Sequence, residues 1–197
     1  MERPILRGRK VILRKRDYER DLEAYLQWLN DPEMSFWEEP WSEFRPPQRE
    51  DFIKGWWEAQ EKAGTDPHWQ EGIWQIDALD GRYIGRITHS DISEPHRRCE
   101  VGIVIWAKDL WGKGYGTDAM MTLLHHLFQE RKVHRVECAT WSGNAGMIRC
   151  AEKSGFRREG VRREAVYNLR DGRYYDSVLF GILEREFELI GDPAGST

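Results

Sequence analysis

Residues 111–120 read Trp-Gly-Lys-Gly-Tyr-Gly-Thr-Asp-Ala-Met, and this glycine-rich stretch is the most informative part of the chain. It follows an apolar segment, Arg98 to Trp106, and precedes residues whose apolar side chains recur at helical spacing. Alternating glycines let successive backbone N–H groups approach a ligand closely, and the N-terminus of a following helix adds unpaired N–H groups and a positive dipole end. The stretch from Gly112 to Thr117 therefore predicts a loop that binds a diphosphate.

Two other phosphate-binding motifs fit this stretch less well. A P-loop requires a first glycine where Ala107 stands, and it does not place Gly114 directly after the lysine. The dinucleotide fingerprint G-x-G-x-x-A matches residues 114–119, but residues 107–111 separate the strand from the glycines. Glu137, the candidate for the ribose-binding acid, also lies inside its strand rather than at its end.

The rest of the chain predicts one mixed α/β domain built around one sheet. Residues 1–190 are expected to form this domain, and residues 191–197 a disordered tail. Hydrophobic periodicity and turn residues predict strands at 9–14, 72–79, 83–89, 98–106 and 135–141, and a final hairpin of 160–168 and 173–183. Helices are expected at 17–29, 48–62 and 144–153. The aromatic segment at 34–47 is expected to be irregular.

Composition excludes several classes of protein. The 197 residues include 30 Lys and Arg against 34 Asp and Glu, so the net charge of −4 argues against a nucleic-acid partner. No apolar run approaches the roughly 18 residues that span a bilayer, and the N-terminus lacks a signal-peptide core, so we expect a cytoplasmic protein without a membrane partner. The three cysteines and six histidines show no metal-ligand spacing, which predicts no metal site. The sequence neither requires nor excludes a homodimer.

Tryptophan is unusually abundant. Seven of the ten tryptophans fall within the first 74 residues. Such a concentration suits a substrate pocket or a partner surface, and equally the packing between helices. The seven are Trp28, Trp37, Trp41, Trp56, Trp57, Trp69 and Trp74.

Two motifs in register resemble those of the GCN5-related N-acetyltransferases. The glycine-rich stretch is similar to their Arg/Gln-x-x-Gly-x-Gly/Ala signature, and NAGMIRCAEKSGF at 144–156 is similar to their N-x-x-x-I-x-x-x-x-K-x-G-F helix. EVGIVI before the glycines and DGRYYDSVLFGIL near the end resemble the subgroup that acetylates N-terminal α-amines of ribosomal proteins, and its spermidine-acetylating relatives. The resemblance extends over residues 100–183.

The resemblance implies a mostly antiparallel sheet flanked by helices, with a splayed central pair of strands. It implies acetyl-CoA as the acetyl donor and a primary amine as the acceptor. The exposed backbone of one splayed strand would pair with the pantetheine arm, Asn144 would bond it, and Lys113 would lie near the phosphates. The cofactor-binding residues are then Ile103, Val104, Ile105, Gly112, Lys113, Gly114, Tyr115, Gly116, Thr117 and Asn144.

The sequence departs from the family pattern at three positions. Trp111 stands where the signature has Arg or Gln, and Met147 stands where relatives often have serine. Ala151 replaces the tyrosine that protonates the departing thiolate in many members. The usual general acid is therefore missing, and Tyr167, Tyr174, Ser142 or water are the candidates to replace it.

Acetyl transfer to an amine requires a neutral nucleophile, whereas a lysine-like amine has a pKa of about 10.4. Glu100, at the start of the cofactor strand, is the expected general base, and a surface or cross-strand carboxylate is the alternative role for it. Asp91, Tyr175 and Asp176 are expected to bind the acceptor. A free N–H of the cofactor strand is expected to stabilise the oxyanion.

The chain is thus predicted to be an N-acetyltransferase that transfers acetyl from acetyl-CoA by direct attack in a ternary complex. A protein N-terminal α-amine is the first choice of acceptor. A polyamine or another small amine is the alternative, and a non-catalytic acyl-CoA sensor is the rival from a different class. The sequence alone does not identify the acceptor.

Overall fold

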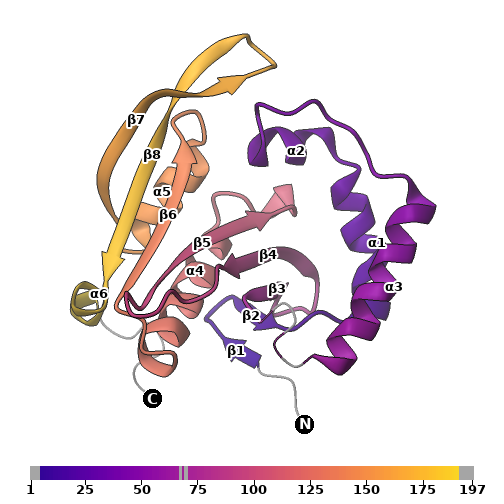
Figure 1. Ribbon diagram of the computed structural model, residues 1–197, viewed down its shortest axis with the longest axis horizontal. Coiled ribbons are helices and arrows are strands. Elements are labelled where there is room, and N and C mark those ends of the chain that lie inside the picture. The colour runs from indigo at the N-terminus through magenta and orange to yellow at the C-terminus, as the bar shows by residue number, and fades with distance from the viewer. Residues whose placement is uncertain (1–4, 67, 69–70, 191–197) are drawn as a thin grey trace.

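The computed structural model describes residues 5–66, 68 and 71–190 of the chain. These residues form one eight-stranded sheet in the order β1-β2-β3-β4-β5-β6-β8-β7 (Figure 1). Every neighbouring pair of strands is antiparallel except β5 and β6. The strands are β1 (Ile5–Arg7), β2 (Val11–Arg14), β3 (Ile73–Ala78), β4 (Tyr83–His89), β5 (Arg98–Ile105), β6 (Arg135–Trp141), β7 (Arg157–Asn168) and β8 (Arg173–Leu183).

Helices cover both faces of the sheet. The largest apolar cluster joins α4 and α5 to the strands, and a second, aromatic cluster joins α1 and α3 to Tyr83 and Val104 on the opposite face. Among the described residues, no helix is long and apolar enough to cross a bilayer. The helices are α1 (Tyr18–Leu29), α2 (Pro32–Glu38), α3 (Arg49–Thr65), η1 (Lys108–Leu110), α4 (Tyr115–His125), η2 (His126–Glu130), α5 (Ala145–Lys153) and α6 (Glu184–Ile190).

The expected mixed sheet flanked by helices is confirmed, but three local expectations were wrong. The segment expected to be irregular contains α2, because Asp31 caps the Glu33 N–H and Pro32 occupies the first turn. The first predicted strand is the second arm of a hairpin, with β1 before it. α6 was not predicted because it directly continues β8 without a break. The tail at 191–197 and Trp69 lie outside the described residues.

The β1–β2 hairpin is fixed to the start of α4. The carboxylate of Asp118 accepts hydrogen bonds from the backbone N–H groups of Arg9, Lys10 and Val11 at 2.7–3.2 Å. Gly8 packs so closely that an added Cβ would lie 2.5 Å from the Asp118 carboxylate. These contacts hold the N-terminus of α4, and with it the glycine loop, against the sheet.

A buried ion network joins β2, β3 and α1. Arg14 donates to Asp21 at 2.6 Å and to Asp77 at 2.7 Å, and the Asp21 side chain is completely buried. Burial alone would lower the pKa of the Arg14 guanidinium, but its hydrogen bonds to the two carboxylates outweigh burial and raise it. The network therefore ties the first helix to the sheet through charges that are hidden from water.

Replacement of Asp21 by alanine is expected to destabilise the fold by about 3 kcal/mol. The change leaves the Arg14 guanidinium buried with one carboxylate partner instead of two, which is costlier than removing the whole pair. Urea unfolding of both proteins measures the difference. As a control, Glu23→Ala removes a surface carboxylate of the same helix, paired with Arg49, and should cost less than about 1 kcal/mol. Equal stability of Asp21→Ala and wild type would contradict the assigned role.

Candidate functional site

The parallel strands β5 and β6 separate soon after they pair. Their register runs from Arg98 opposite Arg135 to Glu100 opposite Glu137 and stops there. β5 continues to Ile105 beside β4, and β6 continues to Trp141 beside β8. Figure 1 shows the two halves of the sheet diverging from this point. The predicted splayed pair of strands is therefore present.

The splay leaves backbone groups of β5 without a strand partner. Hydrogen bonds from Ser90 N to Glu100 O and from Trp106 N to Ile84 O show that even-numbered residues of β5 pair with β4. Since bonded and non-bonded pairs alternate along an antiparallel ladder, the backbone groups of Ile103 and Ile105 point toward β6 instead. An extended ligand that enters the gap between β5 and β6 could pair with those of these groups that no side chain occupies.

The glycine loop, residues 112–117, lies at one end of the gap between β5 and β6. Gly112 and Gly114 adopt positive φ angles of +73° and +87°, a conformation that other residues rarely take. Gly114 is the N-cap of α4 and carries no side chain that could satisfy the first N–H groups of the helix. Those N–H groups and the positive end of the helix dipole thus remain available for an anion.

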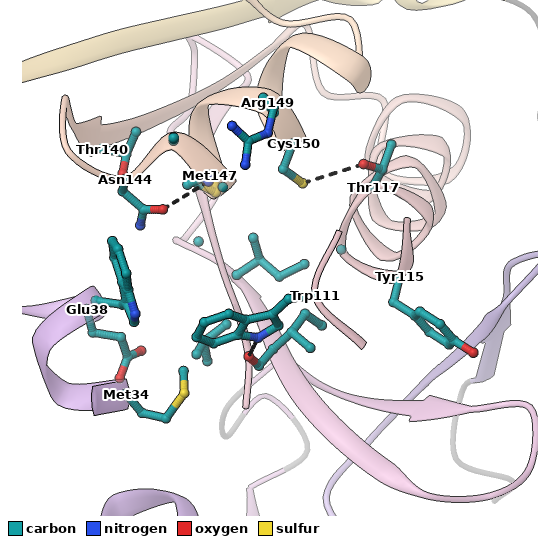
Figure 2. Close-up of a pocket in the computed structure, with 18 of the residues that line it drawn as sticks. Met34, Glu38, Trp111, Tyr115, Thr117, Thr140, Asn144, Met147, Arg149 and Cys150 are labelled. Carbon is teal, nitrogen blue, oxygen red and sulfur yellow. Dashed lines mark hydrogen bonds between the residues drawn. The ribbon is translucent and has the colours of Figure 1, made fainter. Parts of the chain in front are cut away.

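A single cavity of 790 Å³ joins the splay, the glycine loop and α5. Its volume lies within the range of about 300–1,000 Å³ typical of ligand sites. Figure 2 shows Tyr115 and Thr117 at one end, Met34 and Glu38 at the other, and Trp111 between them. Nine of the ten predicted cofactor-binding residues line the cavity, and Lys113 is the exception: it is exposed on the loop outside it.

The Trp111 side chain occupies one of the backbone groups that β5 turns toward β6. Its indole Nε1 donates a hydrogen bond to the Ile105 carbonyl at 2.7 Å, while the ring lines the cavity. The family signature that this stretch resembles has Arg or Gln at this position, so in this chain an aromatic side chain stands where a polar one is usual. The groups of β5 left open to a ligand are therefore the N–H and C=O of Ile103 and the N–H of Ile105.

Asn144 is positioned by its own helix. It is the N-cap of α5, and its Oδ1 accepts a hydrogen bond from the Met147 N–H at 3.0 Å. In Figure 2 its amide nitrogen points away from Met147 and toward the cavity. Arg149, Cys150 and Lys153 line the cavity from the same helix, and two of these bring positive charge. The helix motif contains Lys153 but not Arg149, and it does not say which side of the helix faces a cleft.

The predicted base and the predicted acceptor residues lie outside the cavity lining. Glu100 is exposed where β5 leaves β6, and Asp91 is exposed in the loop after β4. The Asp176 carboxylate accepts the Glu164 N–H at 2.9 Å, in a bulge of the β7–β8 hairpin where Glu164 has a φ of +51°. The Tyr175 hydroxyl donates to Asp171 at 2.7 Å. The structure thus gathers nine of the ten predicted cofactor-binding residues around one cavity, but not these four.

The end of the cavity opposite Tyr115 and Thr117 (Figure 2) is lined by residues that the sequence did not assign to a site, apart from two of the abundant tryptophans. α2 and the residues after it contribute Met34, Trp37, Glu38, Glu39 and Trp41, and β4 contributes Arg86 and Thr88. The abundance of tryptophan was the available signal, and the structure divides these residues between the cavity and the core. Trp37 and Trp41 line the cavity, whereas Trp28, Trp56 and Trp74 are buried core.

Among the described residues, Tyr115 is the tyrosine that lines the cavity, and it lies at the end away from Met34 and Glu38 (Figure 2), whereas the three tyrosines of the hairpin do not line it. Ala151 is fully buried in the main core, and Met147 lines the cavity with a thioether that has no proton to give. The Tyr175 hydroxyl is held by Asp171, and this hydrogen bond is the main cause of the raised pKa of Tyr175. Tyr167 and Tyr174 pack against one another on the exposed hairpin, with ring centroids 5.0 Å apart.

Replacement of Tyr167, Tyr174 or Tyr175 by phenylalanine is therefore expected to give a protein that keeps most of the wild-type kcat. A true general acid contributes roughly 10²–10⁴-fold, so its loss is readily visible. The measurement is kcat of each variant at saturating acetyl-CoA, with folding checked by thermal melting. A variant that stays folded, binds CoA and loses two decades or more would identify that tyrosine as the acid.

Comparison with known proteins supplies the family. The family model for the acetyltransferase (GNAT) domain matches residues 10–157. The putative ribosomal N-acetyltransferase YdaF of Bacillus subtilis is 30% identical over 128 residues, which cover 62% of this chain and 68% of that protein. The chain therefore belongs to the GNAT family, and it is an acetyl-CoA-dependent N-acetyltransferase by class.

Solved structures share the fold. Spermidine N-acetyltransferase from Vibrio cholerae, in complex with CoA and spermine, superposes with a TM-score of 0.71 at 19% identity, covering 91% of this chain and 98% of that one. The ribosomal-protein-S5-alanine acetyltransferase from Vibrio fischeri gives a TM-score of 0.71 at 17% identity, covering 93% and 98%. At these identities the likeness concerns the fold alone, and the two proteins act on different amines.

Proposed function

We propose that this protein acetylates the α-amine of a protein or peptide N-terminus, with acetyl-CoA bound along β5 and the acceptor entering between α2 and the β7–β8 hairpin. The observation that carries the proposal is the single cavity that joins the glycine loop to an acceptor end made of carboxylates and tryptophans. Direct attack in a ternary complex suits such a cavity, because both substrates occupy it together.

The donor half fits CoA by its chemistry. The N–H groups at the start of α4 and the loop 112–117 suit the diphosphate, and Arg149 and Lys153 add positive charge along the same wall. The open backbone groups of Ile103 and Ile105 suit the amides of pantetheine, with the Asn144 amide opposite them. In this arrangement an N–H of β5 also lies where the acetyl oxygen develops negative charge.

The acceptor half suits one amine rather than several. Two carboxylates line it, Glu38 and Glu39, and the first is already paired with Arg86 at 3.7 Å. A polyamine carries several cations and needs several carboxylates along its length. Trp37, Trp41 and Trp111 provide aromatic faces that suit a single cation and its apolar neighbours.

An N-terminal α-amine also lowers the demand on a base. Its pKa of about 7.7–8.0 leaves a useful neutral fraction near pH 7.5, whereas a lysine-like amine with a pKa of about 10.4 is almost wholly protonated. YdaF, a putative ribosomal N-acetyltransferase, supports a protein N-terminus as acceptor. The spermidine enzyme of the same fold keeps a polyamine as the second candidate.

The test is a screen for release of CoA thiol from acetyl-CoA, with N-terminal peptides, spermidine and small primary amines as acceptors. Mass spectrometry of the peptides locates the acetyl group. Turnover with peptides whose α-amine is free, and none with the same peptides blocked at the N-terminus, is the expected result. Preference for spermidine would establish the alternative acceptor. Binding of CoA without turnover of any amine would favour a non-catalytic sensor and overturn the proposal.

A further inference from the structure

Glu38 is the one carboxylate at the acceptor end that is already engaged by a cation. It is the last residue of α2, it lines the cavity, and 37% of its side chain stays exposed. Figure 2 places it with Met34 at the end of the cavity opposite Tyr115 and Thr117. An acetyl group carried along β5 from the glycine loop is therefore presented toward the end that holds Glu38.

Arg86 holds this carboxylate loosely. One guanidinium nitrogen lies 3.7 Å from the Glu38 Oε1, which is long for an ion pair. Another nitrogen donates to the Tyr25 hydroxyl at 2.6 Å, and the guanidinium lies 5.0 Å from the centre of the Trp28 ring. Since α1 anchors Arg86, the arginine orients Glu38 without saturating it, and carboxylate lone pairs remain for a second cation.

The surroundings also tune the proton affinity of Glu38. Partial burial in the cleft is the largest cause and raises the pKa of Glu38, Arg86 opposes it, and the neighbouring Glu39 adds to it. These two are the charged groups that act on Glu38 among the described residues. A carboxylate with a raised pKa is a stronger base than an ordinary one.

We propose that Glu38 receives the acceptor amine as an ammonium ion and takes the proton that must leave before nitrogen attacks, an assignment that rests on the acetyltransferase function proposed above. The first proton passes from nitrogen to the Glu38 carboxylate. The freed lone pair forms the C–N bond with the acetyl carbon, and the C–S bond breaks. The second nitrogen proton goes to the departing sulfur through water, which leaves an amide and the CoA thiol, and Glu38 returns its proton to solvent.

Glu100 is the rival base, and the two assignments predict different variants to fail. Glu38→Gln is expected to lower kcat/KM for an N-terminal peptide by roughly 5–10-fold at pH 7, because only about a tenth to a fifth of an amine with a pKa of about 7.7–8.0 is then neutral. Activity should recover as the pH rises above the pKa of the amine, where the nucleophile is neutral without help. Glu43→Gln removes an exposed carboxylate a few residues further along the chain and should match wild type. The rise in melting temperature caused by CoA should be the same in all of these proteins, because Glu38 does not bind the donor.

A second pair of variants separates a base from a merely structural residue. Arg86→Gln removes the opposing cation and should move the acidic limb of the kcat/KM profile to higher pH. Glu39→Gln removes a neighbouring negative charge and should move that limb to lower pH. The two variants should shift the acidic limb in opposite directions only if the Glu38 carboxylate itself titrates in the reaction.

The outcomes are distinguishable. Loss of activity in Glu100→Gln but not in Glu38→Gln would overturn the assignment in favour of Glu100 and leave the acetyltransferase function intact. The assignment would also be overturned if kcat/KM of Glu38→Gln were lower than that of wild type by the same factor at every pH. Such a constant loss would indicate a positioning or folding defect, which high pH does not repair. Wild-type protein that binds CoA and acetylates no amine would overturn the function and this assignment together.

Discussion

Replacement of Gly114 by aspartate is expected to abolish the stabilisation of the protein by CoA. Gly114 has a φ of +87° at the N-cap of α4, so any side chain there is strained, and aspartate adds a negative charge where the diphosphate is expected to bind. Wild type should gain melting temperature as CoA is added, by mass action on the folded state, and NAD should give no such gain. The rate of acetyl transfer by Gly114→Asp should fall as well, because the variant binds acetyl-CoA weakly.

The control for Gly114→Asp separates charge from strain. Gly114→Ala imposes the same φ penalty without the charge, and the added Cβ would be in ordinary van der Waals contact with the Lys10 Cε, at 3.9 Å. We expect Gly114→Ala to lose some stability and to keep a CoA-dependent shift. Stabilisation of wild type by NAD and not by CoA would contradict the assigned diphosphate site and the cofactor.

Replacement of Ile103 by proline is expected to lower kcat by roughly 10²–10³-fold, the usual cost of losing an oxyanion donor. The Ile103 N–H points into the splay and takes no part in the β4–β5 ladder, so proline removes the ligand-facing donor and leaves the ladder complete. The preceding residue, Gly102, accepts the restriction that a following proline imposes. Weaker CoA binding should accompany the loss.

Two variants make the Ile103→Pro result interpretable. Ile103→Ala removes the side chain and keeps the N–H, so it accounts for the lost apolar packing. Val104→Pro instead removes an N–H from the ladder with β4 and is expected to destabilise the sheet itself. If Ile103→Pro stays folded and turns over as fast as Ile103→Ala, this N–H has no part in catalysis.

The donor half of the site was predictable because it is local in sequence. Glycines with positive φ, the helix that follows them and the capping asparagine of α5 lie within residues 112–153, and each is recognisable from its neighbours along the chain. The acceptor half is not local. Glu38 comes from a short helix that sequence periodicity missed, and Arg86 comes from β4 about 50 residues later.

One physical reason explains why four predicted site residues lie outside the cavity lining. Glu100, Asp91, Tyr175 and Asp176 all lie next to strands of the cofactor half, where sequence parity allows a side chain to face the cleft. Parity fixes only the face of a strand, and it does not say how far a splayed pair has opened or which neighbour covers the side chain. In the fold the Asp176 carboxylate caps a bulge and the Tyr175 hydroxyl caps a turn, so neither lines the cavity.

The sequence by itself determined the family, the element order from β2 to β8 apart from α2, the glycine-rich turn before α4 and the absence of the usual tyrosine, since these depend on contacts between residues close in the chain. Only the tertiary structure decided which groups meet at the acceptor end. A backbone hydrogen bond from Leu169 to Pro40 brings the hairpin tip beside the segment after α2, and α1 fixes Arg86 beneath Glu38. Such contacts depend on how whole elements pack, because the energy that places them comes from aromatic and apolar burial spread over many distant residues.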